Sequence, residues 1–178
     1  MDKVLRSPSS NPKKKRTTIA LFRSGSSLNY ETLLQDAAVR AAREQAINLV
    51  TYCGGEIEST IDDRVDFNVL YNLATQHNMD ALVLLTLTLR LFTDTRKMVS
   101  FIEKYGVPTV SMEYKLPDTP AVLVRYEPGM RAVIRHLIDV HGLRRIAFID
   151  GPSFFTDQEP GMIRFQAYLD VLAEYGIP

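Results

Sequence analysis

Several apolar runs of this sequence are followed directly by polar and aromatic side chains, which are the groups best suited to hold a ligand. These residues are Ser24, Asn29, Tyr30, Thr86, Thr88, Glu113, Tyr114, Arg125, Tyr126, Ser153, Phe154 and Phe155. Hydroxyl groups, aromatic faces and an arginine suit a hydroxylated or anionic small molecule, held by hydrogen bonds and ring stacking. Each residue alone is as well explained as a loop side chain in water. The prediction of a binding site therefore rests on their convergence.

Catalytic and metal-binding chemistry has weaker support in the sequence. Cys53 follows an apolar run, where a nucleophile could lie, but no spacing brings a histidine base to it. His77, His136 and His141 are scattered, and none forms a metal-type pair with a second ligand at helical or turn spacing. The two Gly-rich phosphate-binding patterns are absent. We therefore expect no catalytic residue, no metal and no cofactor.

Strands and helices are expected to alternate along the chain. Apolar runs predict buried strands at 17–22, 47–52, 80–85, 108–112 and 121–124. Amphipathic stretches predict helices at 30–46, 65–77, 93–105, 128–140 and 162–175. Thr86–Leu89 alternates polar and apolar residues and is expected to continue the third strand beside a cleft. This order predicts an α/β protein with a doubly wound, mainly parallel sheet.

Two of these elements carry more specific expectations. In the second helix, Val69, Leu70, Leu73 and Ala74 should face inward. The apolar run 146–149 reads as a sixth strand that is covered on both faces, as in a parallel sheet. Because ligands bind beyond the carboxyl ends of such strands, residues from 151 onward should point at a cleft.

Composition excludes several classes of protein. The 21 basic and 21 acidic side chains cancel, so no overall field draws the chain to nucleic acid or to a membrane. No apolar run reaches the length of a membrane span. A single cysteine rules out an internal disulfide framework and fits a reducing compartment, so we expect a cytoplasmic protein. Residues 1–16 hold a Ser/Pro-rich stretch and the cluster Lys13–Arg16, which predict a flexible basic tail, with nucleic-acid binding or nuclear import as a minor alternative.

The second half of the chain resembles the effector-binding core of the lac-repressor family, which shares the type I periplasmic binding protein fold. The resemblance is carried by Ile138–Pro152, by Arg164-Phe-Gln-Ala-Tyr168 and by Leu172–Ile177, which come in the family's order. Val50–Glu56 and the Val-His-Gly junction look closer to a subgroup in which the domain is a sensor joined to a histidine kinase, a diguanylate cyclase or another output module. The resemblance covers 17–178, and its motifs are specific together and weak singly.

The resemblance implies two α/β lobes with a sugar, a nucleoside or another small metabolite bound between them. Residues 17–140 would form the first lobe, and 141–178 the crossover with the first strand and helix of the second lobe. Arg164 matches an arginine that family members commonly turn toward the effector. Arg125-Tyr126 stands where many members have Asp-Asn, which alters the usual contacts. A homodimer is also implied, with DNA binding only through a domain not present in this chain.

These observations predict a small-molecule sensor module of a transcription regulator or signal-transduction protein, and not an enzyme. The expected effector-binding residues are Ser24, Asn29, Tyr30, Thr86, Thr88, Arg125, Tyr126, Phe154 and Arg164. One alternative is an α/β enzyme that uses Cys53, Glu113 or His141 in the same cleft. The other is a degenerate domain that only dimerises, with a cleft filled by Tyr126, Phe154 and Phe155.

Overall fold

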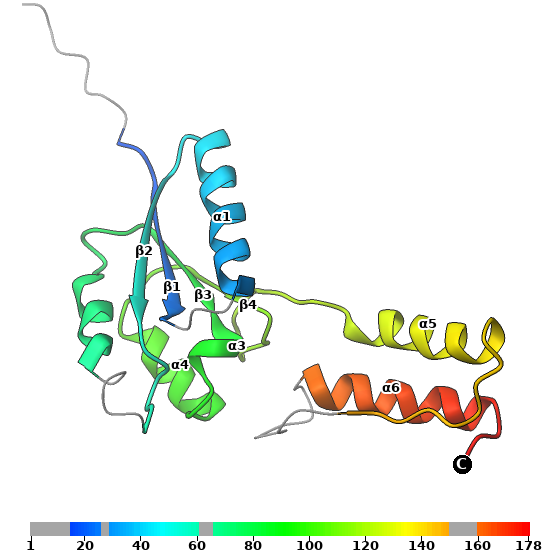
Figure 1. The fold of residues 1–178 in the computed structure, drawn as a ribbon. Helices are drawn as coiled ribbons and strands as arrows, with labels where there is room; N and C mark the ends of the chain where they lie inside the picture. The colour runs from blue at the N-terminus through cyan, green and yellow to red at the C-terminus, as the bar shows by residue number, and fades with distance from the viewer. Residues whose placement is uncertain (1–14, 26–28, 61–65, 150–159) are drawn as a thin grey trace, which may run out of the picture.

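A parallel sheet of five strands forms the first lobe of the protein in the computed structural model, which describes residues 15–25, 29–60, 66–149 and 160–178 (Figure 1). The strands are β1 (Thr18–Ser24), β2 (Asn48–Gly54), β3 (Ala81–Leu85), β4 (Thr109–Met112) and β5 (Ala121–Val122). All neighbours pair in parallel, in the order β2-β1-β3-β4-β5. The predicted doubly wound α/β fold is therefore confirmed.

Helical segments connect these strands and continue beyond them. They are α1 (Asn29–Glu44), the 3-10 helix η1 (Asp66–Leu73), α3 (Thr86–Leu89), α4 (Thr95–Glu103), α5 (Tyr126–Asp139) and α6 (Pro160–Glu174). Among the described residues, no helix combines the length and the apolar character needed to cross a bilayer. Most of the expected basic tail, residues 1–14, lies outside the described residues.

The main core lies on one face of the sheet. Ala20 and Phe22 of β1 and Leu82 and Leu84 of β3 alternate with residues of the other face, and all four are fully buried beneath η1 and α4. The ring of Phe22 lies 4.9 Å from that of Tyr71, and the rings of Tyr52 and Tyr105 also lie within 5.3 Å of it. Helix α1 lies on the opposite side of the strands (Figure 1). An aromatic cluster thus joins η1 and α4 to the centre of the sheet.

The expected inward face of the second helix is wrong in part, since Ala74 is buried as expected and Leu70 is half-buried. Tyr71 is buried, whereas Val69 and Leu73 are each 61% exposed. A 3-10 helix has three residues per turn, so residues three apart, Tyr71 and Ala74, lie on the same side. The sequence pattern assumed the 3.6-residue period of an α-helix and therefore placed Val69 and Leu73 inward, although both are exposed.

Two other local expectations are also corrected. Thr86–Leu89 does not continue β3 but forms the short helix α3, in which the N–H of Arg90 donates to the carbonyl of Thr86. Helix α4 is capped by Asp94, whose carboxylate accepts from the N–H of Lys97 at 2.9 Å. The helix expected at 93–105 is observed at Thr95–Glu103, and Gly106 beyond it has a left-handed φ of +61°.

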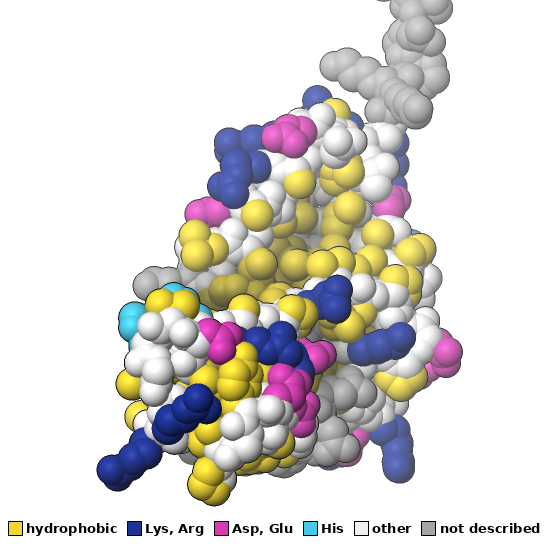
Figure 2. All heavy atoms as spheres, turned by 90° about the vertical axis from the view of Figure 1, so that its right-hand side faces the viewer, with side chains coloured by type: hydrophobic (Ala, Val, Ile, Leu, Met, Phe, Trp, Pro, Cys, Tyr) yellow, Lys and Arg dark blue, Asp and Glu magenta, His cyan; other side chains and the backbone are white. Residues whose placement is uncertain are grey.

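Helices α5 and α6 form a second packed unit beside the first lobe (Figure 1). Ile134 and Ile138 of α5 pack with Tyr168, Val171 and Leu172 of α6 in a core separate from that of the sheet. The packing of α5 is therefore with α6. The sequence-based boundary at residue 140 instead assigned α5 to the first lobe. The connection at 122–124 is exposed, and hydrophobic side chains cover the side of the first lobe that lies behind the α5–α6 unit in Figure 2.

The expected sixth strand is absent from the described residues. Ile146 and Phe148 are half-buried against the core of the α5–α6 unit, and Tyr168 donates its hydroxyl proton to the carbonyl of Ile146 at 2.8 Å. Ile149 points the other way and is 95% exposed. A strand needs a neighbouring strand to satisfy its backbone groups, and no described strand lies beside 146–149. The alternation of buried and exposed side chains is nevertheless that of an extended segment covered on one face.

We predict that Gly54→Ala destabilises the first lobe by about 1–3 kcal/mol, because an added methyl group would overpack the aromatic core. A Cβ on Gly54 would lie 2.4 Å from the ring of Tyr71. That ring cannot easily move, since its hydroxyl lies within 2.9 Å of the carbonyl oxygens of Arg23 and Gly55. Hydrogen exchange should show weakened amide protection in β1–β4 and unchanged protection in α6.

Gly129→Ala is the matched control. Gly129 lies within α5, and an added Cβ there would meet no atom within 4 Å. Alanine favours a helix over glycine by up to about 1 kcal/mol, so this variant should be neutral or stabilised. Equal losses in both variants would contradict the packing described here.

Candidate ligand-binding site

The carboxyl ends of β1, β3 and β4 meet at one edge of the sheet. Strand order reverses between β1 and β3, because the chain runs outward to β2 on one side and to β4 and β5 on the other. In open α/β sheets this reversal leaves a crevice at the carboxyl ends of the strands, where ligands bind. Ser24 ends β1, Thr86 follows β3 and Glu113 follows β4. The topology therefore brings these three predicted strand-end residues to the same edge.

Glu31 occupies the centre of this edge and is completely buried. It is the third residue of α1, where a negative charge is favoured by the helix dipole. One carboxylate oxygen accepts protons from the hydroxyls of Ser24, at 3.0 Å, and of Thr88. The other oxygen lies 3.1 Å from the guanidinium of Arg23. Glu31 thus ties the end of β1 to the start of α1 and to α3.

Thr86 is held in a similar way at the end of β3. Its hydroxyl lies 2.6 Å from that of Ser111 on β4, and Ser111 donates its own proton to the carbonyl of Tyr114. Thr86 is therefore the donor to Ser111. The hydroxyls of Ser24, Thr86 and Thr88 are all buried and bonded within the protein, so these three expected contact residues position the strand ends.

Glu113 differs from these residues because it has an unused acceptor group. Its side chain is only 7% exposed, and neither carboxylate oxygen has a hydrogen-bond partner of good geometry among the described residues. Burial raises the pKa of Glu113, the charge of Glu31 raises it further, and the facing Tyr30 hydroxyl acts in the opposite direction. The backbone at Glu113 is left-handed, with φ +69°, which is uncommon for a residue with a side chain.

Two tyrosines lie beside this carboxylate, and an arginine contacts one of them. Burial and the charge of Glu113 raise the pKa of Tyr30, which is 44% exposed, and also that of Tyr126 at the start of α5. The guanidinium of Arg164 on α6 lies 5.4 Å from the centre of the Tyr126 ring and acts on Tyr126 in the opposite direction. We call Glu113, Tyr30, Tyr126 and Arg164 the Glu113 cluster. It joins the first lobe to α6.

The remaining expected binding residues are less defined. Arg125 is exposed immediately before α5. Asn29 begins α1, but its side chain lies outside the described residues, as do Phe154 and Phe155. The alternative of a degenerate domain expected Tyr126, Phe154 and Phe155 to fill the cleft. Of these three residues only Tyr126 is described, and it is half-buried.

Sequence reasoning missed several residues that shape this edge. Arg23 and Glu31 form the buried pair, and the buried guanidinium of Arg90 lies 4.0 Å above the ring of Tyr114. Glu31 had a readable signal, as an acidic residue in the first turn of a helix that follows a strand. Arg90 had no comparable sequence signal, because nothing in the residues around it indicates that a cation is buried there.

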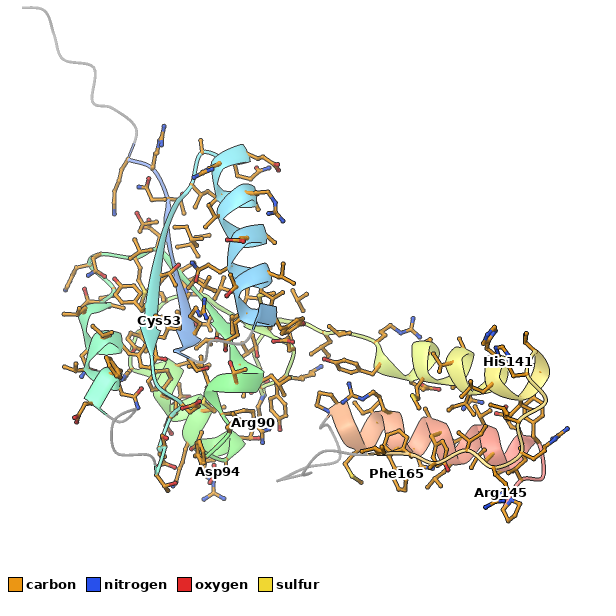
Figure 3. All side chains as sticks on the ribbon, viewed as in Figure 1. Cys53, Arg90, Asp94, His141, Arg145 and Phe165 are labelled. Carbon is orange, nitrogen blue, oxygen red and sulfur yellow. The ribbon has the colours of Figure 1, made fainter. Side chains whose placement is uncertain are left out.

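Two of the three residues of the rival enzyme hypothesis, Cys53 and His141, lie far apart. Cys53 lies at the end of β2 in the first lobe, whereas His141 lies at the far end of α5 (Figure 3). The thiol of Cys53 makes only a long contact of 3.9 Å with the carbonyl of Ser24. No described residues form a group of three or more metal-ligand side chains.

Comparison with known proteins identifies the architecture. No family model and no curated protein matches the sequence. Among solved structures, a sugar-binding LacI-family transcriptional regulator from Escherichia coli, complexed with phosphate, matches at 22% identity and a TM-score of 0.62 over 92% of this chain and 56% of its own. The chain has the fold of lac-repressor-type effector domains.

Two further structures share this lac-repressor-type fold. A periplasmic solute-binding protein of an ABC transporter from Actinobacillus succinogenes, with bound D-allose, matches at 18% identity and a TM-score of 0.66 over 91% of this chain and 57% of its own. The lac repressor dimer bound to operator and an anti-inducer matches at 16% identity and a TM-score of 0.66. The match covers 93% of this chain and 54% of that chain. The chain thus spans about half the length of the structures that it matches, as the sequence resemblance implied.

We predict that Glu113→Gln stabilises the protein at neutral pH. Because burial raises the pKa of Glu113 above its ordinary value of 4.5, the folded protein holds this proton more tightly than the unfolded chain. The contribution of Glu113 to stability is therefore greatest at acid pH and is lost as the pH rises through the raised pKa. The amide removes this dependence, so the variant should gain on the order of 1 kcal/mol near neutral pH and progressively less toward acid.

Urea unfolding at a series of pH values measures this difference. Glu103→Gln, on the exposed side of α4, is the control and should change stability by less than about 0.5 kcal/mol at every pH. A Glu113→Gln variant no more stable than the parent at neutral pH would show that the carboxylate already has a satisfactory partner.

Proposed function

We propose that this chain is a small-molecule effector-binding module of a transcription regulator or signal-transduction protein. The observation that carries the proposal is Glu113, a buried carboxylate that faces the Tyr30 hydroxyl but has no hydrogen-bond partner of good geometry among the described residues, at the edge where ligands bind in such sheets. A buried polar group left unsatisfied costs about 1–3 kcal/mol. A ligand hydroxyl or amine that donates to Glu113 would recover this energy.

The surroundings of Glu113 favour a hydroxylated ligand with a flat or apolar face. Tyr30 and Tyr126 offer rings on which a sugar or a nucleoside could stack, and both carry hydroxyls at the same place. Arg164 approaches from α6 and could bind ligand oxygens. The matched proteins described as sugar-binding and as holding D-allose support this choice of ligand class.

The same cluster suggests how binding would be transmitted. Glu113 and Tyr30 belong to the first lobe, whereas Tyr126 and Arg164 belong to α5 and α6. A ligand that contacts both sets would favour one arrangement of the two units over others, with each 1.4 kcal/mol of differential affinity shifting the populations tenfold. An attached output domain would report this shift.

Binding without catalysis is the simpler role for these residues. The candidate nucleophile Cys53 and the candidate base His141 belong to different units. The exposed Cys53 thiol suits a reducing compartment such as the cytoplasm. We propose DNA binding only through a domain other than this one.

We predict that neutral sugars or nucleosides stabilise the protein in thermal-shift measurements. A ligand present at 100 times its Kd adds about 2.7 kcal/mol to the stability of the folded state. For any ligand found, Tyr30→Phe should weaken binding about three- to tenfold by calorimetry, because it removes one hydroxyl from the Glu113 cluster.

Tyr175→Phe provides the control for this measurement. Its hydroxyl donates to Asp139, away from the Glu113 cluster, so affinity should be unchanged. Absence of a shift with every aldohexose, pentose and nucleoside tested would reject the proposed ligand class.

We also propose that the first lobe forms a homodimer through the surface of η1. Phe67 and Leu73 are more than half exposed, and their spacing of six residues places them on one side of a 3-10 helix. Helix η1 packs against β2, the edge strand, where Val50 is also exposed. Contiguous exposed apolar side chains of this kind mark interfaces. The lac repressor match is described as a dimer, which supports the second copy as the partner.

We therefore expect Leu73→Lys to shift the protein from dimer to monomer in sedimentation equilibrium, since it places a charge within the apolar surface. Val133→Lys is the control, because Val133 is similarly exposed on α5 in the other unit. A parent protein that is monomeric at high micromolar concentration would exclude this interface.

A further inference from the structure

Two histidines at the far end of α5 come together although the sequence gave no reason to pair them. The Nε2 atoms of His136 and His141 lie 3.1 Å apart, and their rings meet edge to face with centres 4.9 Å apart. No helical or turn spacing in the sequence would pair these two residues with each other. His141 lies at the end of α5 that is remote from the first lobe (Figure 3).

The pairing depends on how the helix ends. Residues five apart do not share a face of an α-helix, so His141 must leave the helical path to reach His136. The chain turns at Gly142, which has a left-handed φ of +64°. The N–H of Gly142 donates to the carbonyl of Ile138 at 3.0 Å, and that of Leu143 to Leu137 at 3.1 Å. These two bonds hold the turn that brings the rings together.

We propose that His136 and His141 form a binding site for a divalent transition-metal ion such as Zn²⁺, Ni²⁺ or Cu²⁺. With metal–nitrogen bonds of about 2.0–2.1 Å, a separation of 3.1 Å corresponds to an N–metal–N angle of about 100°. This angle lies between the octahedral value of about 90° and the tetrahedral value of about 109°, so both geometries are within reach. Imidazole nitrogen is a favoured ligand for these ions.

The surroundings also favour a cation at this position. The last carbonyl groups of α5 carry the negative end of the helix dipole, which attracts positive charge. Of the charged neighbours, Arg135 binds Glu174 at 2.8 Å and Asp139 accepts from Tyr175 at 2.8 Å, while the exposed Arg144 and Arg145 follow the turn. Both histidines are exposed, so water can complete the coordination. Histidine side chains are visible at the surface of this end of the molecule in Figure 2.

A bound ion would act on the α5–α6 unit. It would hold the turn between α5 and the segment 143–149, whose Ile146 and Phe148 pack against α5 and α6. Because the ion binds the folded arrangement of the two rings, it should stabilise this unit. The histidine site is separate from the Glu113 cluster, so its test does not depend on the proposed effector.

Calorimetric titration of tag-free protein with NiCl₂ and ZnCl₂ tests the proposal. We expect one ion per chain, released by EDTA, with affinity lowered at least about tenfold in both His136→Asn and His141→Asn. His77→Asn is the matched control, since the third histidine lies in the first lobe, and it should bind as the parent does. Circular dichroism confirms that each variant is folded, as expected for exposed positions.

Electron paramagnetic resonance of the Cu²⁺-loaded protein gives a second readout. Two nitrogen ligands should appear in the parent and one in each single variant, whereas an ordinary imidazole hydrogen bond would leave no such difference. Affinities within twofold of the parent in either histidine variant, or an equal loss in His77→Asn, would overturn the proposal.

Discussion

The buried carboxylate of Glu31 holds together the candidate binding edge of this protein. It accepts from Ser24 and Thr88 and pairs with Arg23, so that the ends of two strands and the start of a helix meet at one group. Removing one partner of a buried ion pair typically costs about 3–5 kcal/mol, because the other charge is left without compensation. The same negative charge also raises the pKa of Glu113. The Glu31 carboxylate therefore both fixes the strand ends and favours the protonated form of Glu113.

Among the described residues, the two packed units meet through a narrow region. Their cores are separate, and the connection at 122–124 is exposed. Tyr126 lies where they meet, beside Glu113 on one side and Arg164 on the other. An arrangement with few contacts between units costs little to change, so the small free energy of ligand binding could alter it.

The fold class followed from local patterns, but several details did not. The strands expected at 17–22 and 80–85 were readable because buried parallel strands carry apolar runs, and the structure forms β1 and β3 there. The helix 66–73 was misread because its period is three and not 3.6. Residues 146–149 have the composition of a buried strand, yet only one of their faces is covered. Amino-acid composition indicates that a segment favours an extended conformation, but a strand forms in a sheet only when another strand lies beside it.

At the candidate binding edge, too, some features could be predicted from the sequence and others could not. Ser24, Thr86 and Thr88 were recognised as strand-end hydroxyls, but their bonds to Glu31 and Ser111 make them structural. Glu113 was noticed as a strand-end residue, while its burial and its lack of a partner among the described residues became visible only in three dimensions. By itself, the sequence determined the alternation of strands and helices, and hence the edge at which a ligand would bind. Only the tertiary structure decided which side chains at that edge are bonded within the protein, and which histidines meet, because hydrogen-bond partners come from segments far apart in the chain.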